Sequence, residues 1–137
     1  MTENRFHIAF LGVGLMGAPM VRNLLDAGYP MTLWNRTGSK CEPFADEAII
    51  AGTPEDAVRD ADIVITITSS SRPVLEGKWL SPGTHINAAG SNHWMRLEID
   101  GEAVERARVV VTDDVEQAKI ECGDLIHPID RGVLRWR

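Results

Sequence analysis

Three glycines near the N-terminus have the spacing of a phosphate-binding loop. Gly12, Gly14 and Gly17 form the pattern G-x-G-x-x-G, with Leu15 and Met16 before the last glycine. In such a loop the first glycine permits a tight turn, the second lets a pyrophosphate approach the backbone, and the third lets the next helix pack closely on a sheet. The free N–H groups at the start of that helix then face the anion. The alternative is a glycine-rich turn with a purely structural role.

The residues on either side of this loop favour the binding role. Residues 6–11 form a short apolar run, which predicts a buried parallel strand. Residues 15–27 carry apolar side chains at helical spacing, and Gly28 supplies a helix stop. A glycine pattern between a strand and a helix is typical of dinucleotide-binding domains. We therefore expect NAD or NADP to bind at this loop.

The end of the second predicted strand, residues 30–35, bears on which of the two cofactors binds. NAD-binding domains usually carry Asp or Glu there to hold the ribose hydroxyls, whereas this chain has Asn35, Arg36 and Thr37. No carboxylate repels a 2′-phosphate, and a guanidinium and a hydroxyl are available to bind it. The pattern favours NADP, with NAD as the weaker alternative. Arg36 could instead be a solvated loop residue that merely stacks on the adenine.

The rest of the chain alternates between strand and helix signals. Four more strands are predicted, over residues 49–51, 63–68, 84–88 and 108–112. Helices are predicted from the cap Thr53-Pro54 onward, over residues 101–107, and over residues 115–122 with a stop at Gly123. Pro43 restricts the helical pattern of residues 39–47. Six strands interleaved with helices predict a single α/β domain over residues 1–137, a doubly wound parallel sheet of the Rossmann type with strand order 3-2-1-4-5-6.

Thr68 and Ser69 lie at the end of the strand predicted over residues 63–68. Ligands of doubly wound sheets bind outside the carboxyl ends of the strands. We therefore expect these two residues to contact the cofactor ribose, although the run from Ser69 to Ser71 could also be an ordinary polar loop.

Composition and charge exclude several other classes of function. The chain has 137 residues and a net charge of −6, which opposes nonspecific binding to nucleic acid or to an anionic membrane. No apolar run approaches the roughly 20 residues that span a bilayer, and the N-terminus has no secretory signal. Cys41 and Cys122 form no Cys-x-x-Cys pair, so we expect inert thiols and a cytoplasmic protein. No histidine has the spacing of a metal ligand, and we expect no metal.

The first half of the chain resembles a family of β-hydroxyacid dehydrogenases, that of 3-hydroxyisobutyrate dehydrogenase and glyoxylate/succinic semialdehyde reductase. The resemblance covers residues 7 to about 68. It is carried by the runs from Gly12 to Met20, from Trp34 to Thr37 and from Thr53 to Val64. In that family the string Asn-Arg-Thr accompanies the use of NADPH, which agrees with the preference inferred from Arg36.

The second half resembles a different family, that of ornithine cyclodeaminase and μ-crystallin. The residues that carry this likeness are the run from Pro73 to Asn92, then Glu98-Ile-Asp100, Arg108 to Asp114, Glu116 to Ala118, and Gly123 to Ile126. Both families contain a Rossmann domain. We therefore interpret the chain as two recombined half-domains of engineered or natural origin, joined at about residues 62–72.

The second resemblance also bears on the site. In that family the segment matching Asn87 to Asn92 lines the nicotinamide end of the cleft, which implies a cofactor contact at Ala89. A catalytic aspartate of the cyclodeaminases aligns with Asn92, and an amide cannot act as a carboxylate base. The candidate cofactor-binding residues are therefore Gly12, Gly14, Leu15, Met16, Gly17, Asn35, Arg36, Thr37, Thr68, Ser69 and Ala89.

No residue of the chain is assigned a catalytic role. The substrate-binding and catalytic residues of both families lie in other domains, so the favoured hypothesis is an isolated NAD(P)-binding domain without complete catalytic machinery. Two alternatives stay open: a minimal NADPH-dependent oxidoreductase that is active as a homodimer, and a regulatory domain that senses a nucleotide.

Overall fold

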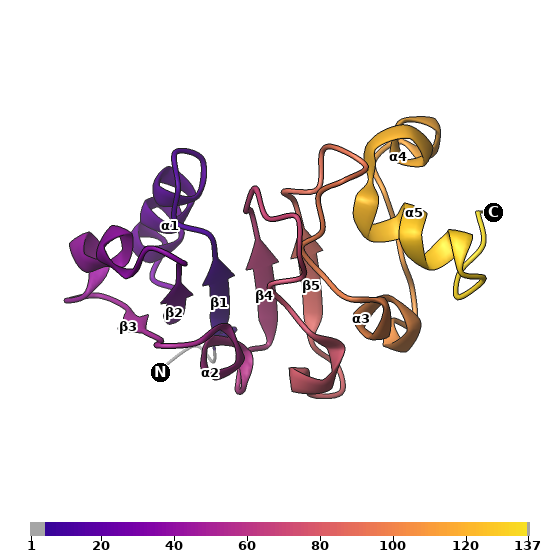
Figure 1. Ribbon diagram of the computed structural model, residues 1–137. Coiled ribbons are helices and arrows are strands. Elements are labelled where there is room, and N and C mark those ends of the chain that lie inside the picture. The colour runs from indigo at the N-terminus through magenta and orange to yellow at the C-terminus, as the bar shows by residue number, and fades with distance from the viewer. Residues whose placement is uncertain (1–4, 137) are drawn as a thin grey trace.

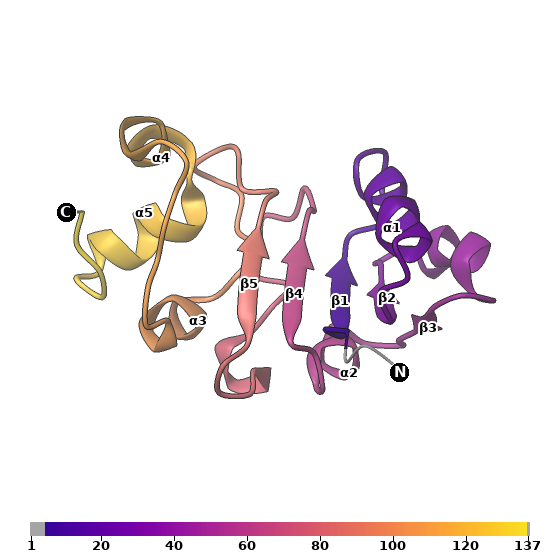
Figure 2. The same ribbon diagram turned by 180° about the vertical axis from the view of Figure 1, so that it is seen from behind.

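Five parallel strands form the centre of the computed structural model, which describes residues 5–136. The strands are β1 (Ile8–Leu11), β2 (Met31–Trp34), β3 (Ile49–Ile50), β4 (Ile63–Thr66) and β5 (His85–Ala88). They lie side by side in the order β3-β2-β1-β4-β5, as Figure 1 and Figure 2 show from opposite sides. β1 pairs with both β2 and β4, so Ile8 lies opposite Met31 on one side and Ile63 on the other. The chain winds outward in both directions from β1, and the point between β1 and β4 is the place where such sheets bind ligands.

The strands carry apolar residues on both faces because helices cover both faces. Successive residues of a strand point to opposite sides, so β1 contributes to two separate core clusters. One cluster includes Ile8, Phe10, Val21, Leu33, Cys41 and Phe44. The other includes Ala9, Leu11, Ala57, Val58, Val64 and Leu75. Each fully buried Val, Leu, Ile or Phe side chain stabilises the fold by about 1.5 to 3 kcal/mol.

The helices of the first half begin and end where local sequence signals place them. α1 (Gly17–Asp26) ends before Gly28, which has a φ of +83°. α2 (Pro54–Val58) begins after Thr53, whose hydroxyl oxygen accepts a hydrogen bond from the backbone N–H of Asp56 at 3.1 Å. Pro43 lies in a tighter 3-10 helix, η1 (Gly38–Phe44), so residues 39–47 do not form a regular α-helix.

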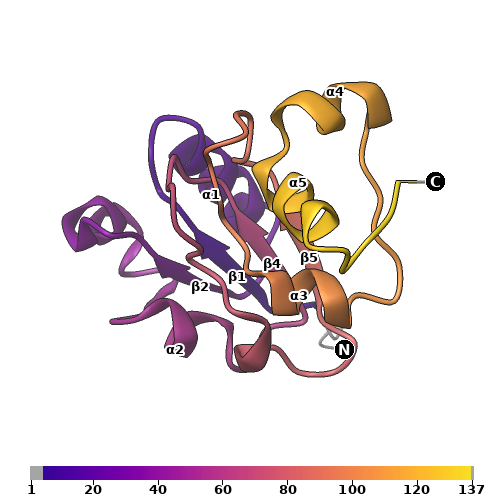
Figure 3. The same cartoon turned by 45° about the vertical axis from the view of Figure 1, so that its right-hand side comes forward.

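The C-terminal helices lie beyond the β5 edge of the sheet. A short 3-10 helix, η2 (Gly77–Trp79), precedes β5, and α3 (Gly101–Arg106), α4 (Val115–Glu121) and α5 (Gly123–Asp130) follow it. α5 contacts both α3 and α4, and Figure 3 shows it between them. Asp100 and Asp114 cap α3 and α4, each by accepting a hydrogen bond from a backbone N–H three residues on.

The sixth strand expected over residues 108–112 is absent, and this prediction was wrong. The segment connects α3 to α4 without pairing to β5, and the side chains of Val109 and Val111 are 72% and 84% exposed. Valine favours strands because it fits a pleated, half-buried surface, and no neighbouring strand offers such a surface here. The sheet therefore ends at β5, although its α/β class is the one expected.

The helix predicted over residues 115–122 is α4 and ends before Gly123, but it is not the last helix of the chain, which is a second correction. Gly123 begins α5, a helix that the sequence analysis did not predict. A Cβ atom at Gly123 would lie only 2.7 Å from the carbonyl oxygen of Trp94. The glycine is therefore required by close packing rather than by a helix stop.

Three further properties concern the described residues. None of the helices in residues 5–136 is long and apolar enough to cross a membrane. Within the same residues no three His, Cys, Asp or Glu side chains gather as metal ligands. Burial raises the pKa of the thiols of Cys41 and Cys122, which lowers their thiolate fraction and hence their reactivity.

Candidate functional site

The glycine loop joins β1 to α1 at the carboxyl edge of the sheet. Gly12 has a φ of +109°, and a Cβ atom there would lie 2.5 Å from the carbonyl oxygen of Ile67. A Cβ atom at Gly17 would overlap the carbonyl group of Gly12, so only glycine allows α1 to start this close to the loop. Gly14 has open space beside it, with nothing within 4 Å of an added Cβ atom. The open side of the loop is thus at the glycine that a pyrophosphate would approach.

The start of α1 has no side-chain cap. The Ala18 N–H donates to the carbonyl of Gly14 at 3.0 Å, and Pro19 has no N–H. The Gly17 N–H is therefore the first-turn group left for a ligand. Leu15 and Met16 beside it are 98% and 67% exposed. Apolar side chains that remain this exposed at a helix start without a side-chain cap fit a surface that a ligand covers.

Asn35 has a structural role in holding the glycine loop. Its side-chain oxygen accepts a hydrogen bond from the backbone N–H of Val13 at 2.9 Å, and its amide nitrogen donates one to the carbonyl of Thr37 at 3.0 Å. Arg36 and Thr37 are exposed. Within residues 5–136 the Arg36 guanidinium makes no hydrogen bond or ion pair, so it is available to a ligand.

The remaining predicted residues follow β4 and β5 at the same edge. The Thr68 methyl group would lie 2.9 Å from a Cβ atom at Gly12, so the end of β4 adjoins the glycine loop. Ser69 and Ala89 are exposed, and the Ala89 N–H donates to the Thr66 carbonyl at 2.8 Å. The predicted residues therefore lie along one sheet edge, in the order of the strands β2, β1, β4 and β5.

A buried carboxylate behind this edge was missed by the sequence analysis. Glu98 is fully buried and accepts hydrogen bonds from the Thr66 hydroxyl at 2.8 Å, from the Gly90 N–H at 2.6 Å and from the Thr68 N–H. A single glutamate in a loop is usually solvated, so its residue type gave no reason to expect burial. The only sequence signal was its place in the string Glu98-Ile-Asp100, one of the strings that resemble the cyclodeaminase family.

A second buried acid holds the backbone of Glu98. Asp124 Oδ1 accepts hydrogen bonds from the N–H groups of Glu98 at 2.7 Å and Ile99 at 3.1 Å. Asp124 Oδ2 is buried and has no hydrogen-bond partner among residues 5–136. Burial raises the pKa of this carboxyl to about 6, since water no longer stabilises the charged form.

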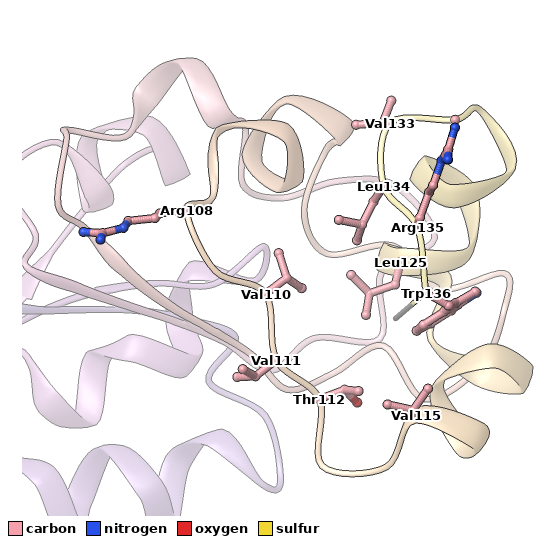
Figure 4. A pocket seen from close by; sticks show the side chains of 11 residues that line it. Arg108, Val110, Val111, Thr112, Val115, Leu125, Val133, Leu134, Arg135 and Trp136 are labelled. Atoms are coloured by element: carbon pink, nitrogen blue, oxygen red, sulfur yellow. The ribbon is translucent and has the colours of Figure 1, made fainter.

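Two other features lie outside the candidate site. Asn92, where the cyclodeaminases have an acid, is exposed, and its side-chain oxygen accepts a hydrogen bond from Arg96 at 3.1 Å. A groove of about 710 Å³ lies among the C-terminal elements, lined by residues that include Val110, Val111, Leu125 and Trp136 (Figure 4). The groove is formed by elements beyond β5 and includes none of the residues predicted to bind a cofactor.

Comparison with known proteins places this fold and loop among nicotinamide-cofactor proteins. Residues 7–91 match the family of the NAD-binding domain of 6-phosphogluconate dehydrogenase. The chain is 37% identical to the rat ketimine reductase μ-crystallin over 98 residues, which cover 69% of this chain and 31% of the relative.

Two solved structures are similar over nearly the whole chain. The structure of Thermococcus litoralis Δ1-pyrroline-2-carboxylate reductase, in complex with NADH and L-proline, has a TM-score of 0.84 and 25% identity, and covers 96% of this chain and 43% of that protein. A dimer of an archaeal alanine dehydrogenase with bound NAD has a TM-score of 0.80 and 28% identity, and covers 96% of this chain and 42% of the other.

The extent of these matches tests the interpretation of the chain as two half-domains joined at about residues 62–72. The chain spans about a third of the length of the curated relatives it matches. A match over 69% of a 137-residue chain must run through residues 62–72, and the family match to residues 7–91 also does. The comparisons therefore give no support to separate origins on the two sides of that segment.

The strand order, the glycine loop and the family match agree on the class of domain. The parallel sheet is wound in both directions from β1, and the loop lies at the carboxyl end of β1. The match covers more than half of the chain. The protein belongs to the family of the NAD-binding domain of 6-phosphogluconate dehydrogenase.

Proposed function

We propose that the chain binds NADP across the carboxyl edge of its sheet, with NAD as a weaker ligand. The observation that carries the proposal is the glycine loop from Gly12 to Gly17, which is open at Gly14 and leads into an uncapped helix. In the proposed complex the pyrophosphate contacts the loop and the N-terminus of α1. Thr68, Ser69 and Ala89 contact the half of the cofactor that lies over β4 and β5.

The preference for NADP rests on the residues that follow β2. Asn35 is engaged with Val13 and Thr37, so the groups left for the adenosine ribose are the Arg36 guanidinium and the Thr37 hydroxyl. A charge-assisted hydrogen bond from Arg36 to a 2′-phosphate contributes about 1.5 to 3 kcal/mol. That energy corresponds to roughly one to two decades in the ratio of the two dissociation constants.

The chain is proposed to be a cofactor-binding module without catalysis of its own. Asn92 offers only an amide where the cyclodeaminases have an acid, and its oxygen is bonded to Arg96. Incubation of the chain with NADPH and an imine such as Δ1-pyrroline-2-carboxylate tests this. The expected result is no oxidation of NADPH, and turnover above about 1 per second would contradict it.

A second candidate is an NADPH-dependent reductase whose site is completed in a homodimer. Two observations favour it: the solved archaeal alanine dehydrogenase is a dimer, and a groove with apolar side chains, among them Val110, Val111 and Trp136, lies beyond β5. Light scattering separates the candidates when it is combined with the turnover assay. A dimeric mass together with NADPH oxidation supports the reductase, and a monomeric, inactive chain supports the module.

A further inference from the structure

Glu98 connects the two loops that follow β4 and β5. Its Oε1 atom accepts the hydrogen bond from the Thr68 N–H, and its Oε2 atom accepts those from the Gly90 N–H and the Thr66 hydroxyl. The side chain comes from a segment outside the sheet and is completely buried. A buried carboxylate needs partners for its oxygen atoms, and these three donors supply them.

The backbone of Glu98 is fixed as firmly as its side chain. Its N–H donates to Asp124 Oδ1 at 2.7 Å, and its carbonyl accepts from the N–H groups of Val74 at 2.8 Å and Leu75 at 3.0 Å. These backbone bonds hold the carboxylate in place between the Thr68 loop and the Gly90 loop, so it sets the distance between the two loops. Gly90 fits this arrangement because a Cβ atom there would lie 2.5 Å from Glu98 Oε1.

The loops held by Glu98 occupy one half of the sheet edge. Arg36 lies beyond β2, on the opposite side of the glycine loop from β4 and β5. A dinucleotide with its adenosine at Arg36 and its pyrophosphate at the glycine loop therefore places its nicotinamide over Thr68 and Ala89. We propose that Glu98 is a positioning residue for the nicotinamide half of the cofactor, acting through the Thr68 and Gly90 loops. This inference rests on the cofactor binding proposed above.

The variant Glu98→Gln tests the proposal because it preserves size and removes one acceptor atom. A glutamine has one carbonyl oxygen, so its NH₂ group must face a backbone N–H of either the Thr68 or the Gly90 loop. One loop thus loses its anchor. Asp100→Asn is the matched control, since Asp100 accepts hydrogen bonds from the N–H groups of Gly77 and Ala103 and from neither loop.

The readout compares a whole cofactor with its adenosine half. We expect Glu98→Gln to weaken NADPH binding about tenfold, and to reduce the fluorescence enhancement of the bound nicotinamide, while the affinity for 2′,5′-ADP changes less than about twofold. Asp100→Asn is expected to leave both affinities within about twofold, because the two hydrogen bonds of this carboxylate hold Gly77 and Ala103 and neither of the two loops. Equal losses for both ligands in Glu98→Gln, or no loss for either, would overturn the positioning role.

A measurement on the unaltered protein covers the case in which Glu98→Gln does not fold. The amide protons of Thr68 and Gly90 are expected to exchange slowly without any cofactor, because both donate to a buried carboxylate. Exchange as fast as that of exposed loop amides would overturn the proposal. If the unaltered protein binds neither NADPH nor 2′,5′-ADP, the proposed cofactor function itself fails, and this inference fails with it.

Discussion

The backbone N–H of Val13 donates a hydrogen bond to the side-chain oxygen of Asn35 at 2.9 Å. This contact ties the glycine loop after β1 to the loop after β2. Val13 is almost fully buried, so its N–H has no access to water in place of this partner. Asn35 was predicted to contact the cofactor, and the contact shows how it can shape the site without touching a ligand.

Replacement of Asn35 tests this tether. Asn35→Ala leaves the buried N–H of Val13 without an acceptor, and we expect the free energy of unfolding to fall by about 1 to 3 kcal/mol. Asn23→Ala is the control, because Asn23 is an exposed residue of α1, and it should change stability by less than about 0.5 kcal/mol. Urea denaturation measures both, and equal small effects would show that the tether contributes nothing.

Two glycine variants separate folding from ligand access. Gly17→Ala forces a Cβ atom into the carbonyl group of Gly12, so we expect it to destabilise the fold by about 1 to 3 kcal/mol. Gly14→Ala meets nothing within 4 Å and should change stability by less than about 0.5 kcal/mol, while its methyl group weakens cofactor binding at the open side of the loop. Thermal denaturation and NADPH titration of both variants give the two readouts. A Gly14→Ala protein that binds NADPH normally would contradict the assignment of this glycine to pyrophosphate contact.

Much of the first half could be predicted from local sequence signals. The strand, glycine loop and helix from Ile8 to Asp26, and the cap at Thr53, each depend on neighbouring residues alone. The positive φ of Gly12 and the close approach of Gly17 to Gly12 are local as well, whereas the clash between a Cβ atom at Gly12 and the Ile67 carbonyl depends on a distant strand.

The features that could not be predicted depend on contacts between distant segments. Val109 and Val111 have strand propensity, but pairing depends on whether their segment reaches the β5 edge. Glu98 is buried against segments that are distant in the sequence. Its side chain bonds to Gly90, 8 residues away, and to Thr66, 32 residues away. Gly123 was predicted to be a helix stop, whereas it begins α5, which packs on α3 and α4.

Arg36 provides the test of cofactor preference. Arg36→Ala removes the guanidinium but no hydrogen bond or ion pair within the described residues, so we expect stability to change little and the NADP-to-NAD affinity ratio to fall by about 10- to 100-fold. Arg59→Ala is the control, because Arg59 is an exposed arginine that pairs with Asp56 near α2. An unchanged ratio in Arg36→Ala would show that this arginine is a solvated loop residue.

The raised pKa of Asp124 makes stability depend on pH in a defined direction. Its carboxyl has a pKa of about 6 in the folded protein, above the usual 3.8. The folded state therefore retains a proton that the unfolded state loses as the pH rises from about 4 to 6. Ionised Asp124 opposes folding above that range, by about 3 kcal/mol at most.

Asp124→Asn removes this ionisation and keeps an oxygen for the N–H groups of Glu98 and Ile99. Relative to this variant, the unaltered protein is expected to lose stability between pH 4.5 and pH 7.5. Urea denaturation at the two pH values measures the difference. Asp60→Asn, at an exposed position, controls for the loss of one surface charge. A stability difference between the unaltered protein and Asp124→Asn that is the same at both pH values would rule out a buried titration at Asp124.

Calorimetric titration of NADP into the unaltered chain tests the central claim most directly. The open glycine loop and the uncapped start of α1 predict saturable binding of one NADP per chain with a dissociation constant below about 1 mM, and weaker binding of NAD under the same conditions. If neither nucleotide binds at millimolar concentration, the loop is only a structural turn and the proposed function is wrong.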